Sequence, residues 1–315
     1  MIAFCVESSH ARGMGHLFRS CLLAQAFAEA GYPFKFYVGD HVAGTELLKR
    51  RGVSFEVVPL DDCDQDWETA AILRDGISVW IYDRHRTDIR SAARVKAMSV
   101  PLAMLDDRGS GAAVADLHFA ALAFEPNEIL AGKRILRGLK YLILDPEIRN
   151  YRRIRTSAEK VIVTLGGADT YGVTTKVMSL LATMGRKATI VVGPAFAHDE
   201  DLARESTSDF AVKRNVPSLL EEFAMHDVAI TGGGMTPFEA NACGLPCIVI
   251  ANEDFEIPVG RALEKLGGAL FAGHHSALNQ RSLALDLPVQ SMSKAALQQI
   301  PVDGAARIVK TVLSI

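Results

Sequence analysis

Short apolar runs alternate with longer amphipathic stretches along the whole chain, and this alternation constrains the fold more than any other feature. Residues 2–6 form the first apolar run, and residues 15–30 form the first helical pattern. Further apolar runs occupy residues 34–38, 54–58, 78–82, 102–105, 161–165, 188–192, 228–231 and 246–250. Continuous apolar strands separated by helices are typical of parallel sheets that helices cover on both faces. We therefore predict an α/β fold.

The alternation is interrupted once, near the middle of the chain. With 315 residues, the chain is about twice as long as a usual single domain. Between residues 140 and 160 the chain becomes polar and basic, with Tyr151, Arg152, Arg153 and Arg155. We interpret this stretch as an interdomain linker, although a solvated surface loop has the same composition. The predicted domains are residues 1–150 and 151–315, and the last helix, residues 305–315, is a candidate for packing back toward the first domain.

Charge and hydropathy exclude several kinds of partner. The formal net charge is −3, so no broad basic field is present to bind nucleic acid or an anionic membrane. No run of about 18 apolar residues occurs, and the first residues lack a basic region ahead of an apolar segment. We therefore expect neither membrane insertion nor a signal peptide, and by elimination we expect a small-molecule substrate. The oligomeric state is left open.

The cysteine and histidine patterns do not indicate a metal site. The five cysteines are Cys5, Cys21, Cys63, Cys243 and Cys247. The last two stand four residues apart, but no second pair completes a zinc site. Acidic and histidine clusters at residues 61–66, 198–201 and 274–275 are interpreted as solvated loops. We expect buried thiols in a reducing cytoplasm, and no metal or cofactor.

The first glycine-bearing turn follows the first strand. Gly13 and Gly15 allow a ligand to approach the backbone, and the helix that begins near Gly15 directs free amide groups outward. His16 lies at the positive end of this helix, which favours the neutral imidazole that a general base needs. Arg19 lies one turn later, where phosphate or a carboxylate is a suitable partner. The alternative is a histidine that only caps the helix or satisfies a local hydrogen bond.

A second glycine-bearing turn follows the strand at residues 161–165. Gly166 and Gly167 leave room for a ligand, and Asp169 or Thr170 is suited to cap the next helix. A simple turn with a capping residue explains Asp169 equally well.

The third turn carries three consecutive glycines, which is an entropically costly choice for a simple connection. One interpretation is a well-capped helix, because Thr236 and Glu239 have the spacing of a capping box and Pro237 suits a first helical turn. The other is a diphosphate site, in which Gly233, Gly234, Met235 and Thr236 hold phosphates and Glu239 accepts hydrogen bonds from ribose hydroxyls. The lysine of a Walker sequence is missing.

Polar residues follow several other strands, at the edge of a parallel sheet where ligands bind. Asn252 and Glu253 follow the strand at residues 246–250, and Asn252 is suited to sugar hydroxyls, or to an ordinary turn. In the first half, residues 83–85 and 106–108 occupy equivalent positions.

Three segments carry a family resemblance. With GMGHLFR at residues 13–19, LGGAD at 165–169 and GGGMTPFEANACGLP at 232–246, the chain resembles the UDP-sugar hydrolases of pseudaminic acid biosynthesis and spore-coat polysaccharide relatives. These hydrolases act on UDP-2,4-diacetamido-2,4,6-trideoxy-β-L-altropyranose and belong to the glycosyltransferase-B superfamily. The resemblance covers roughly residues 1–255.

This resemblance implies two Rossmann-like domains that face a central cleft, with UDP bound mainly by the second. It implies that His16 is the base that activates water against the anomeric carbon, so that UDP and a free 2,4-diacetamido-2,4,6-trideoxy hexose are released. It also implies that residues 233–236 hold the diphosphate and that Glu239 holds the ribose. The helix termini would neutralise the leaving phosphates without a metal.

Three segments depart from the family pattern. Met235 stands where the family has a serine, Glu253 where it has a glutamine, and Arg84 and His85 where it has His-Tyr. A glycosyltransferase of the same fold, which passes the sugar to an acceptor, is therefore the alternative function. A sugar-nucleotide sensor without catalysis is a third possibility, but the presence of His16 argues against it.

Overall fold

The computed structural model describes residues 1–8, 14–125, 127–167, 169–214 and 216–315. The chain forms two compact units, which we describe separately. Unit 1 consists of residues 1–144 and 303–315, and unit 2 consists of residues 145–302. The division therefore follows Leu144 rather than residue 150. The C-terminal segment belongs to unit 1 because helix α11 (Gly304–Val312) packs its apolar side on α1 (Gly15–Glu29).

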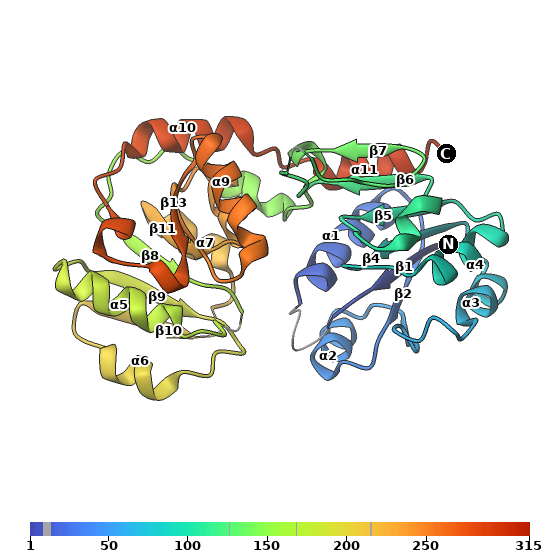
Figure 1. The fold of residues 1–315 in the computed structure, drawn as a ribbon, viewed down its shortest axis with the longest axis horizontal. Coiled ribbons are helices and arrows are strands. Elements are labelled where there is room, and N and C mark those ends of the chain that lie inside the picture. The colour runs from blue at the N-terminus through green and yellow to red at the C-terminus, as the bar shows by residue number, and fades with distance from the viewer. Residues whose placement is uncertain (9–13, 126, 168, 215) are drawn as a thin grey trace. The chain divides into compact units, whose positions relative to one another are not determined.

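Unit 1 is built on a parallel sheet with the strand order β3-β2-β1-β4-β5-β6-β7 (Figure 1). Its strands are β1 (Ile2–Val6), β2 (Phe34–Val38), β3 (Phe55–Val57), β4 (Val79–Asp83), β5 (Leu102–Leu105), β6 (Leu117–Ala120) and β7 (Ile135–Arg137). The central strands β1 and β4 are buried along their whole length, as expected for strands that are covered on both faces.

The side chains of β1 alternate between two apolar layers, one on each face of the sheet. Ile2, Phe4 and Val6 pack against α1, α11 and α2 (Val42–Arg50), whereas Ala3 and Cys5 face the layer formed by α3 (Trp67–Asp75) and α4 (Ile89–Ala97). Short 3-10 turns complete the unit at η1 (Ser110–Val114) and η2 (Leu139–Tyr141). Because successive side chains of a strand point to opposite faces of the sheet, neighbouring residues of β1 lie in opposite layers.

Unit 2 has a second parallel sheet with the order β10-β9-β8-β11-β12-β13 (Figure 1). Its strands are β8 (Val161–Thr164), β9 (Ala188–Val192), β10 (Phe210–Arg214), β11 (Val228–Gly232), β12 (Cys247–Ala251) and β13 (Ala269–His274). Its helices are α5 (Val173–Thr183), α6 (Asp199–Glu205), α7 (Leu219–Met225), α8 (Thr236–Ala242), α9 (Ile257–Lys265) and α10 (Val289–Gln299). Its 3-10 turns are η3 (Pro146–Tyr151), η4 (Asp254–Glu256), η5 (His275–Ala277) and η6 (Gln280–Leu283). The prediction of an α/β fold with parallel sheets is confirmed in both units.

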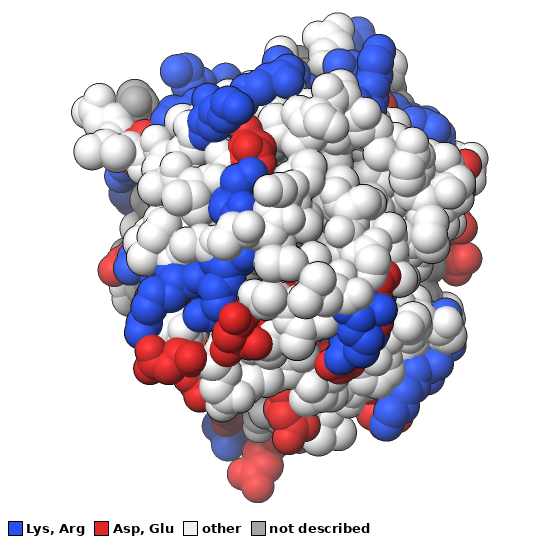
Figure 2. All heavy atoms as spheres, turned by 90° about the vertical axis from the view of Figure 1, so that its right-hand side faces the viewer, with Lys and Arg blue, Asp and Glu red and all other residues white. Residues whose placement is uncertain are grey.

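Charges of both signs are mixed on the face of the molecule that Figure 2 draws. On the face drawn in Figure 2, lysine and arginine side chains stand in several separate groups with acidic residues beside them. Within the described ranges, every helix is too short or too polar to cross a bilayer. All five cysteines are free thiols, and four of them are buried.

Candidate functional site

A buried carboxylate at the carboxyl end of β4 contacts three side chains of α1. Asp83 is the last residue of β4 and lies opposite Val6, the last residue of β1. Because α1 begins soon after β1, its first turns lie above this edge of the sheet. They direct His16, Arg19 and Ser20 toward Asp83, which is completely buried.

The contact between His16 and Asp83 determines which nitrogen of the imidazole is free. His16 Nδ1 lies 2.6 Å from Asp83 Oδ1, and the histidine side chain is 23% exposed. Burial by itself raises the pKa of Asp83, but the charges and hydrogen bonds of Arg19 and His16 outweigh burial and hold the pKa well below its usual range. Since an ionised carboxylate only accepts hydrogen bonds, Nδ1 carries the hydrogen. In the neutral imidazole the lone pair is then on Nε2, as a general base requires.

Arg19 is committed to two carboxylates. Its Nε donates to Asp83 Oδ2 at 2.9 Å, and its Nη1 donates to Asp106 Oδ2 at 2.8 Å. Asp106 follows β5 and has a φ of +49°, an unusual backbone conformation for a residue other than glycine. Of the two partners expected for Arg19, phosphate or carboxylate, the structure shows carboxylates. The main role of Arg19 in the described residues is thus to keep Asp83 ionised.

The beginning of α1 is exposed at Gly15. Gly13 lies outside the described residues. Gly15 is the first residue of α1 and is exposed, and no heavy atom of the described residues lies within 4 Å of the place where its Cβ would be. The N-cap residue, Met14, makes no side-chain capping bond, and the first turn carries no acidic residue. This helix start is therefore suited to an anion.

The neighbouring polar residues of unit 1 mainly hold loops in place. Asp107 accepts hydrogen bonds from the backbone of Thr87 at 3.0 Å and from the amide of Gly109 at 2.7 Å. Arg84 donates to the carbonyl of Leu60 at 2.9 Å and pairs with Asp61 at 2.7 Å. Sequence analysis identified residues 83–85 and 106–108 only by their position after strands. It missed Ser20, whose signal is its position one turn after His16 on the same side of a helix.

In unit 2, the turn after β8 has an open face and a structural face. Gly166 has a φ of +92°, and the Cβ positions of Gly166 and Gly167 both face open space. On the other side, a Cβ at Gly193 would lie 2.4 Å from the carbonyl oxygen of Gly167, so the two loops pack backbone to backbone. Asp169 accepts the amides of Val173 and Thr174 at 2.8 Å and thus caps α5, as the capping interpretation expected.

The turn between β11 and α8 does not form the capping box that we considered. Helix α8 begins at Thr236, and its N-cap is Met235, which makes no side-chain capping bond. Thr236 is therefore already inside the helix and does not cap it. The capping-box interpretation of Thr236 and Glu239 is wrong because the helix starts one residue earlier than that interpretation requires.

The side chain of Glu239 is left without a hydrogen-bond partner among the described residues. This side chain is half-buried, and burial, together with the nearby Asp145, raises its pKa to about 7. An uncompensated carboxyl of this kind is costly to the fold, and such groups are concentrated at functional sites.

Three further residues surround the glycine-rich turn. A Cβ at Gly232 would lie 3.0 Å from Asn252 Nδ2 and 3.6 Å from the carbonyl oxygen of Leu165, so the turns that follow β8, β11 and β12 lie together. The Oδ1 atom of Asn252 is buried and has no partner in the described part of the chain. Sequence analysis missed Glu256, whose Oε2 accepts the amide of Asn252 at 2.7 Å.

An aromatic pair lies near Glu253. The hydroxyl of Tyr171 donates to Glu253 Oε1 at 2.9 Å, and its ring stacks on His275 with 4.5 Å between centroids. His274 is the last residue of β13, and His275 is the first residue of η5. The interpretation of these two histidines as part of a solvated loop was therefore wrong. No group of three or more metal-ligating side chains is found in the described ranges.

The arginines of the predicted linker bind helix ends. Arg152 donates to the carbonyl oxygen of Ala242 at 2.9 Å, at the end of α8. Arg155 is completely buried and donates to the carbonyl oxygens of Cys243 and, at 2.9 Å, Phe223, which belong to the ends of α8 and α7. Burial lowers the pKa of Arg155 to about 10, and the charge of Arg153 adds to this. These side chains satisfy the free carbonyls and negative ends of helices.

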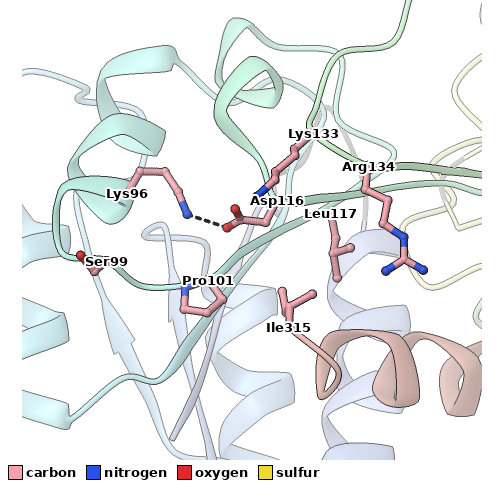
Figure 3. A pocket seen from close by; sticks show the side chains of 8 residues that line it. All are labelled: Lys96, Ser99, Pro101, Asp116, Leu117, Lys133, Arg134 and Ile315. Carbon is pink, nitrogen blue, oxygen red and sulfur yellow. Dashed lines mark hydrogen bonds and ion pairs between the residues drawn. The ribbon is translucent and has the colours of Figure 1, made fainter.

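A hollow of about 590 Å³ lies in unit 1, at the edge of its sheet opposite the one that holds Asp83 (Figure 3). It lies where β5, β6 and β7 begin, and it is lined by Lys96, Ser99, Pro101, Asp116, Leu117, Lys133, Arg134 and Ile315. Lys96 and Asp116 are paired across it at 2.6 Å. It contains none of the predicted site residues.

Comparisons with known proteins place the fold. No protein-family model matches the chain. The chain is 25% identical over 284 residues to the uncharacterized protein MJ1062 of Methanocaldococcus jannaschii, covering 81% of this chain and 56% of that protein. It is 26% identical over 149 residues to the spore coat polysaccharide biosynthesis protein SpsG of Bacillus subtilis, covering 44% of each. The chain thus spans about half the length of the curated relatives it matches.

Solved structures match over the full length. MurG of Acinetobacter baumannii superimposes with a TM-score of 0.72 at 10% identity, covering 100% of this chain and 99% of that one. HepE of Anabaena, solved in complex with UDP, superimposes with a TM-score of 0.65 at 13% identity, covering 100% of both chains. At this level of identity the likeness establishes the glycosyltransferase-B fold, as predicted, and function must be argued from the site.

Proposed function

We propose that this protein hydrolyses a UDP-linked amino-deoxy sugar, with His16 as the general base. The observation that carries the proposal is the bond between His16 Nδ1 and the buried, ionised Asp83, which leaves Nε2 free to take a proton. The fold is shared with the UDP complex of HepE, and a partial sequence match to SpsG favours a role in surface polysaccharide biosynthesis. The proposed products are UDP and a free 2,4-diacetamido-2,4,6-trideoxy hexose.

The proposed reaction is a displacement by water at the anomeric carbon. His16 Nε2 takes a proton from water, the water oxygen bonds to the anomeric carbon, and the bond from that carbon to the diphosphate oxygen breaks. UDP leaves with the electron pair. The resulting imidazolium is stabilised by Asp83, which lies 2.6 Å from Nδ1 and remains ionised because Arg19 also binds it.

Unit 2 is proposed to bind UDP at the carboxyl edge of its sheet. Gly233, Gly234, Met235 and Thr236 are assigned to the diphosphate, and Glu239 to the ribose. The open Cβ positions of Gly166 and Gly167 support close approach of a ligand, and the unpartnered Oδ1 of Asn252 supports a polar one. Glu253, bonded to Tyr171, is assigned to the sugar side. Met235 supplies no hydroxyl, so its contribution is limited to its backbone.

The test is release of UDP from a panel of UDP-amino sugars without an acceptor, including UDP-N-acetylglucosamine and UDP-2,4-diacetamido-2,4,6-trideoxy sugars. We expect release by the wild type from at least one trideoxy sugar and its loss in His16→Ala. Release only after an acceptor is added would replace the hydrolase with the glycosyltransferase. Binding without turnover under both conditions would contradict catalysis altogether.

A further inference from the structure

Among the described residues, a carboxylate occupies the amide groups beside the glycine-rich turn. Glu256 Oε2 accepts the backbone amide of Asn252 at 2.7 Å and that of Gly233 at 3.4 Å. A Cβ at Gly233 would come within 2.6 Å of the Cβ of Glu256, so the turn and this side chain are in direct contact. The two amides follow the neighbouring strands β11 and β12. A carboxylate that accepts two converging amides is bound in the way that a phosphate oxygen is bound.

We propose that Glu256 is a built-in anion that competes with the phosphates of the ligand for these amides. The nucleotide then binds only when this carboxylate is displaced or neutralised. The inference rests on the proposed function, since it assigns the same turn to the diphosphate, and it adds a residue that limits the affinity of that site.

The surroundings of Glu256 supply no cation to hold it in place. In the part of the chain that the structure describes, no lysine, arginine or histidine forms an ion pair with it. The glycine-rich turn, residues 232–235, contains no ionisable side chain, and the remaining nearby charge is the carboxylate of Glu253, whose own partner is the hydroxyl of Tyr171.

Burial is the largest influence on this carboxyl and raises the pKa of Glu256. The amides of Asn252, Gly233 and Glu253 partly offset burial, and the charge of Glu253 raises the pKa further. In the described residues, this carboxylate is half-buried, bonded only to amides and repelled by a neighbour, so it is weakly retained. A diphosphate has more charge and more acceptor oxygens, so it is a stronger partner for the same amides.

A purely structural role makes the opposite prediction. If Glu256 only fastens the loop before α9 to the glycine-rich turn, its charge helps to form the site, and removing the charge leaves ligand affinity equal or lower. Glu256→Gln separates the two roles, because the amide oxygen of glutamine still accepts the bond from Asn252 while the negative charge is lost.

The experiment is isothermal titration calorimetry of the full chain with two probes, UDP and inorganic pyrophosphate, between pH 5.5 and 8.5. The proteins are the wild type, Glu256→Gln and the control Asp254→Asn, which removes a charge from an exposed neighbour in η4. Thermal melts establish that all three are folded. We expect Glu256→Gln to bind both probes about 10-fold more tightly at pH 8, and Asp254→Asn to bind them nearly as the wild type does.

The pH series tests the same point independently. The titration of each probe is common to both proteins, so the ratio of their dissociation constants isolates Glu256. This ratio should be largest at high pH, where the wild-type carboxylate is ionised. It should approach one as the pH falls and Glu256 takes up its proton.

The other outcomes distinguish competition by Glu256 from the proposed binding of a UDP-linked substrate. If UDP binds Glu256→Gln no more tightly than the wild type, competition is wrong and UDP binding stands. If pyrophosphate binds the variant more tightly but UDP binds neither protein, competition stands and the proposed nucleotide substrate is wrong. If neither probe binds either protein at millimolar concentration, both proposals are overturned.

Discussion

His16 and Asp83 lie 67 positions apart in the chain, yet the Nδ1 of one is 2.6 Å from the Oδ1 of the other. The histidine is the second residue of α1 and the aspartate is the last residue of β4, so the pair exists only because β1 and β4 are neighbours in the sheet. The pair assigns a defined tautomer to a partly exposed imidazole. Five predictions follow from this site, the second unit and its linker.

Asp83→Asn should lower kcat for UDP release about 10²–10⁴-fold, because the amide no longer fixes the hydrogen on Nδ1 or stabilises the imidazolium. The measurement is steady-state release of UDP from the substrate that the panel identifies. Ser20→Ala is the matched control, since it removes one 2.7 Å hydrogen bond to the same carboxylate and leaves its charge. Equal losses of kcat in both variants would contradict a special role for the His16–Asp83 pair.

The same carboxylate should make the fold sensitive to acid. The pKa of Asp83 is lower in the folded protein than in the unfolded chain, so its contribution to stability is complete above the ordinary carboxyl pKa of about 4. That contribution is lost as the pH falls from there toward the folded pKa. Urea unfolding at pH 7, 4 and 3 should therefore show the difference between wild type and Asp83→Asn shrinking with acidity. A difference that is constant with pH would show that Asp83 contributes no charge-dependent stability.

Glu239→Gln should have two opposite effects. Burial raises the pKa of Glu239 to about 7, so the folded protein binds this proton more tightly than the unfolded chain and loses stability as the pH rises from about 4.5 to 7. The variant should therefore melt at a higher temperature than the wild type at pH 8 and not at pH 4. If the carboxylate binds ribose hydroxyls, UDP affinity should fall by about 1–3 kcal/mol. Unchanged UDP affinity would remove Glu239 from the ligand site.

Gly193→Ala and Gly167→Ala should separate packing from ligand approach. A Cβ at Gly193 meets backbone oxygens at 2.4 and 2.5 Å, so this variant should lose about 1–3 kcal/mol of unfolding free energy. A Cβ at Gly167 meets nothing within 4 Å, so that variant should keep its melting temperature. If this turn contacts the ligand, Gly167→Ala should weaken the binding of the UDP-sugar while its melting temperature stays the same. Normal binding by Gly167→Ala would exclude this turn from the site.

Arg155→Leu should lower the free energy of unfolding by about 3–5 kcal/mol, because several buried carbonyl oxygens lose their donor at once. Urea denaturation is the measurement. Arg281→Leu, at an exposed position in η6, is the control and should change stability by less than about 0.5 kcal/mol. UDP affinity at pH 7 should be unchanged in refolded Arg155→Leu; a selective loss would indicate that this arginine acts on the ligand.

The central strands were predictable because they are buried on both faces. The predicted run at residues 2–6 and the strand Ile2–Val6 coincide, and all five of its residues are buried. Of the edge strands, β3 was predicted as the run at residues 54–58, whereas β7, β10 and β13 were not. The buried internal strand β6 was also missed. In β10 (Phe210–Arg214) and β7 (Ile135–Arg137), exposed residues interrupt the apolar run, since an edge strand has one side or one face in solvent.

The site was predictable as a set of positions but not as a set of contacts. The glycine turns and His16 stood out because their residue types are costly or chemically active at strand ends. Helix α8 starts one residue earlier than the pattern suggested, so Thr236 is inside the helix and is not its cap. That the linker arginines cap helix ends, rather than meet phosphate, depends on which helices end beside them.

The sequence by itself determined the parallel α/β architecture and the strand ends where polar residues gather, because burial on both faces and glycine-bearing turns are written as local patterns. Only the tertiary structure decided the partners: Asp83 contacts His16, and Glu256 accepts the amides of Gly233 and Asn252. The side chain of Glu239 has no partner among the described residues. The physical reason is that a hydrogen bond or an ion pair depends on distances of a few ångströms. Such distances between residues far apart in the chain are set by strand order and helix packing, which no local pattern records.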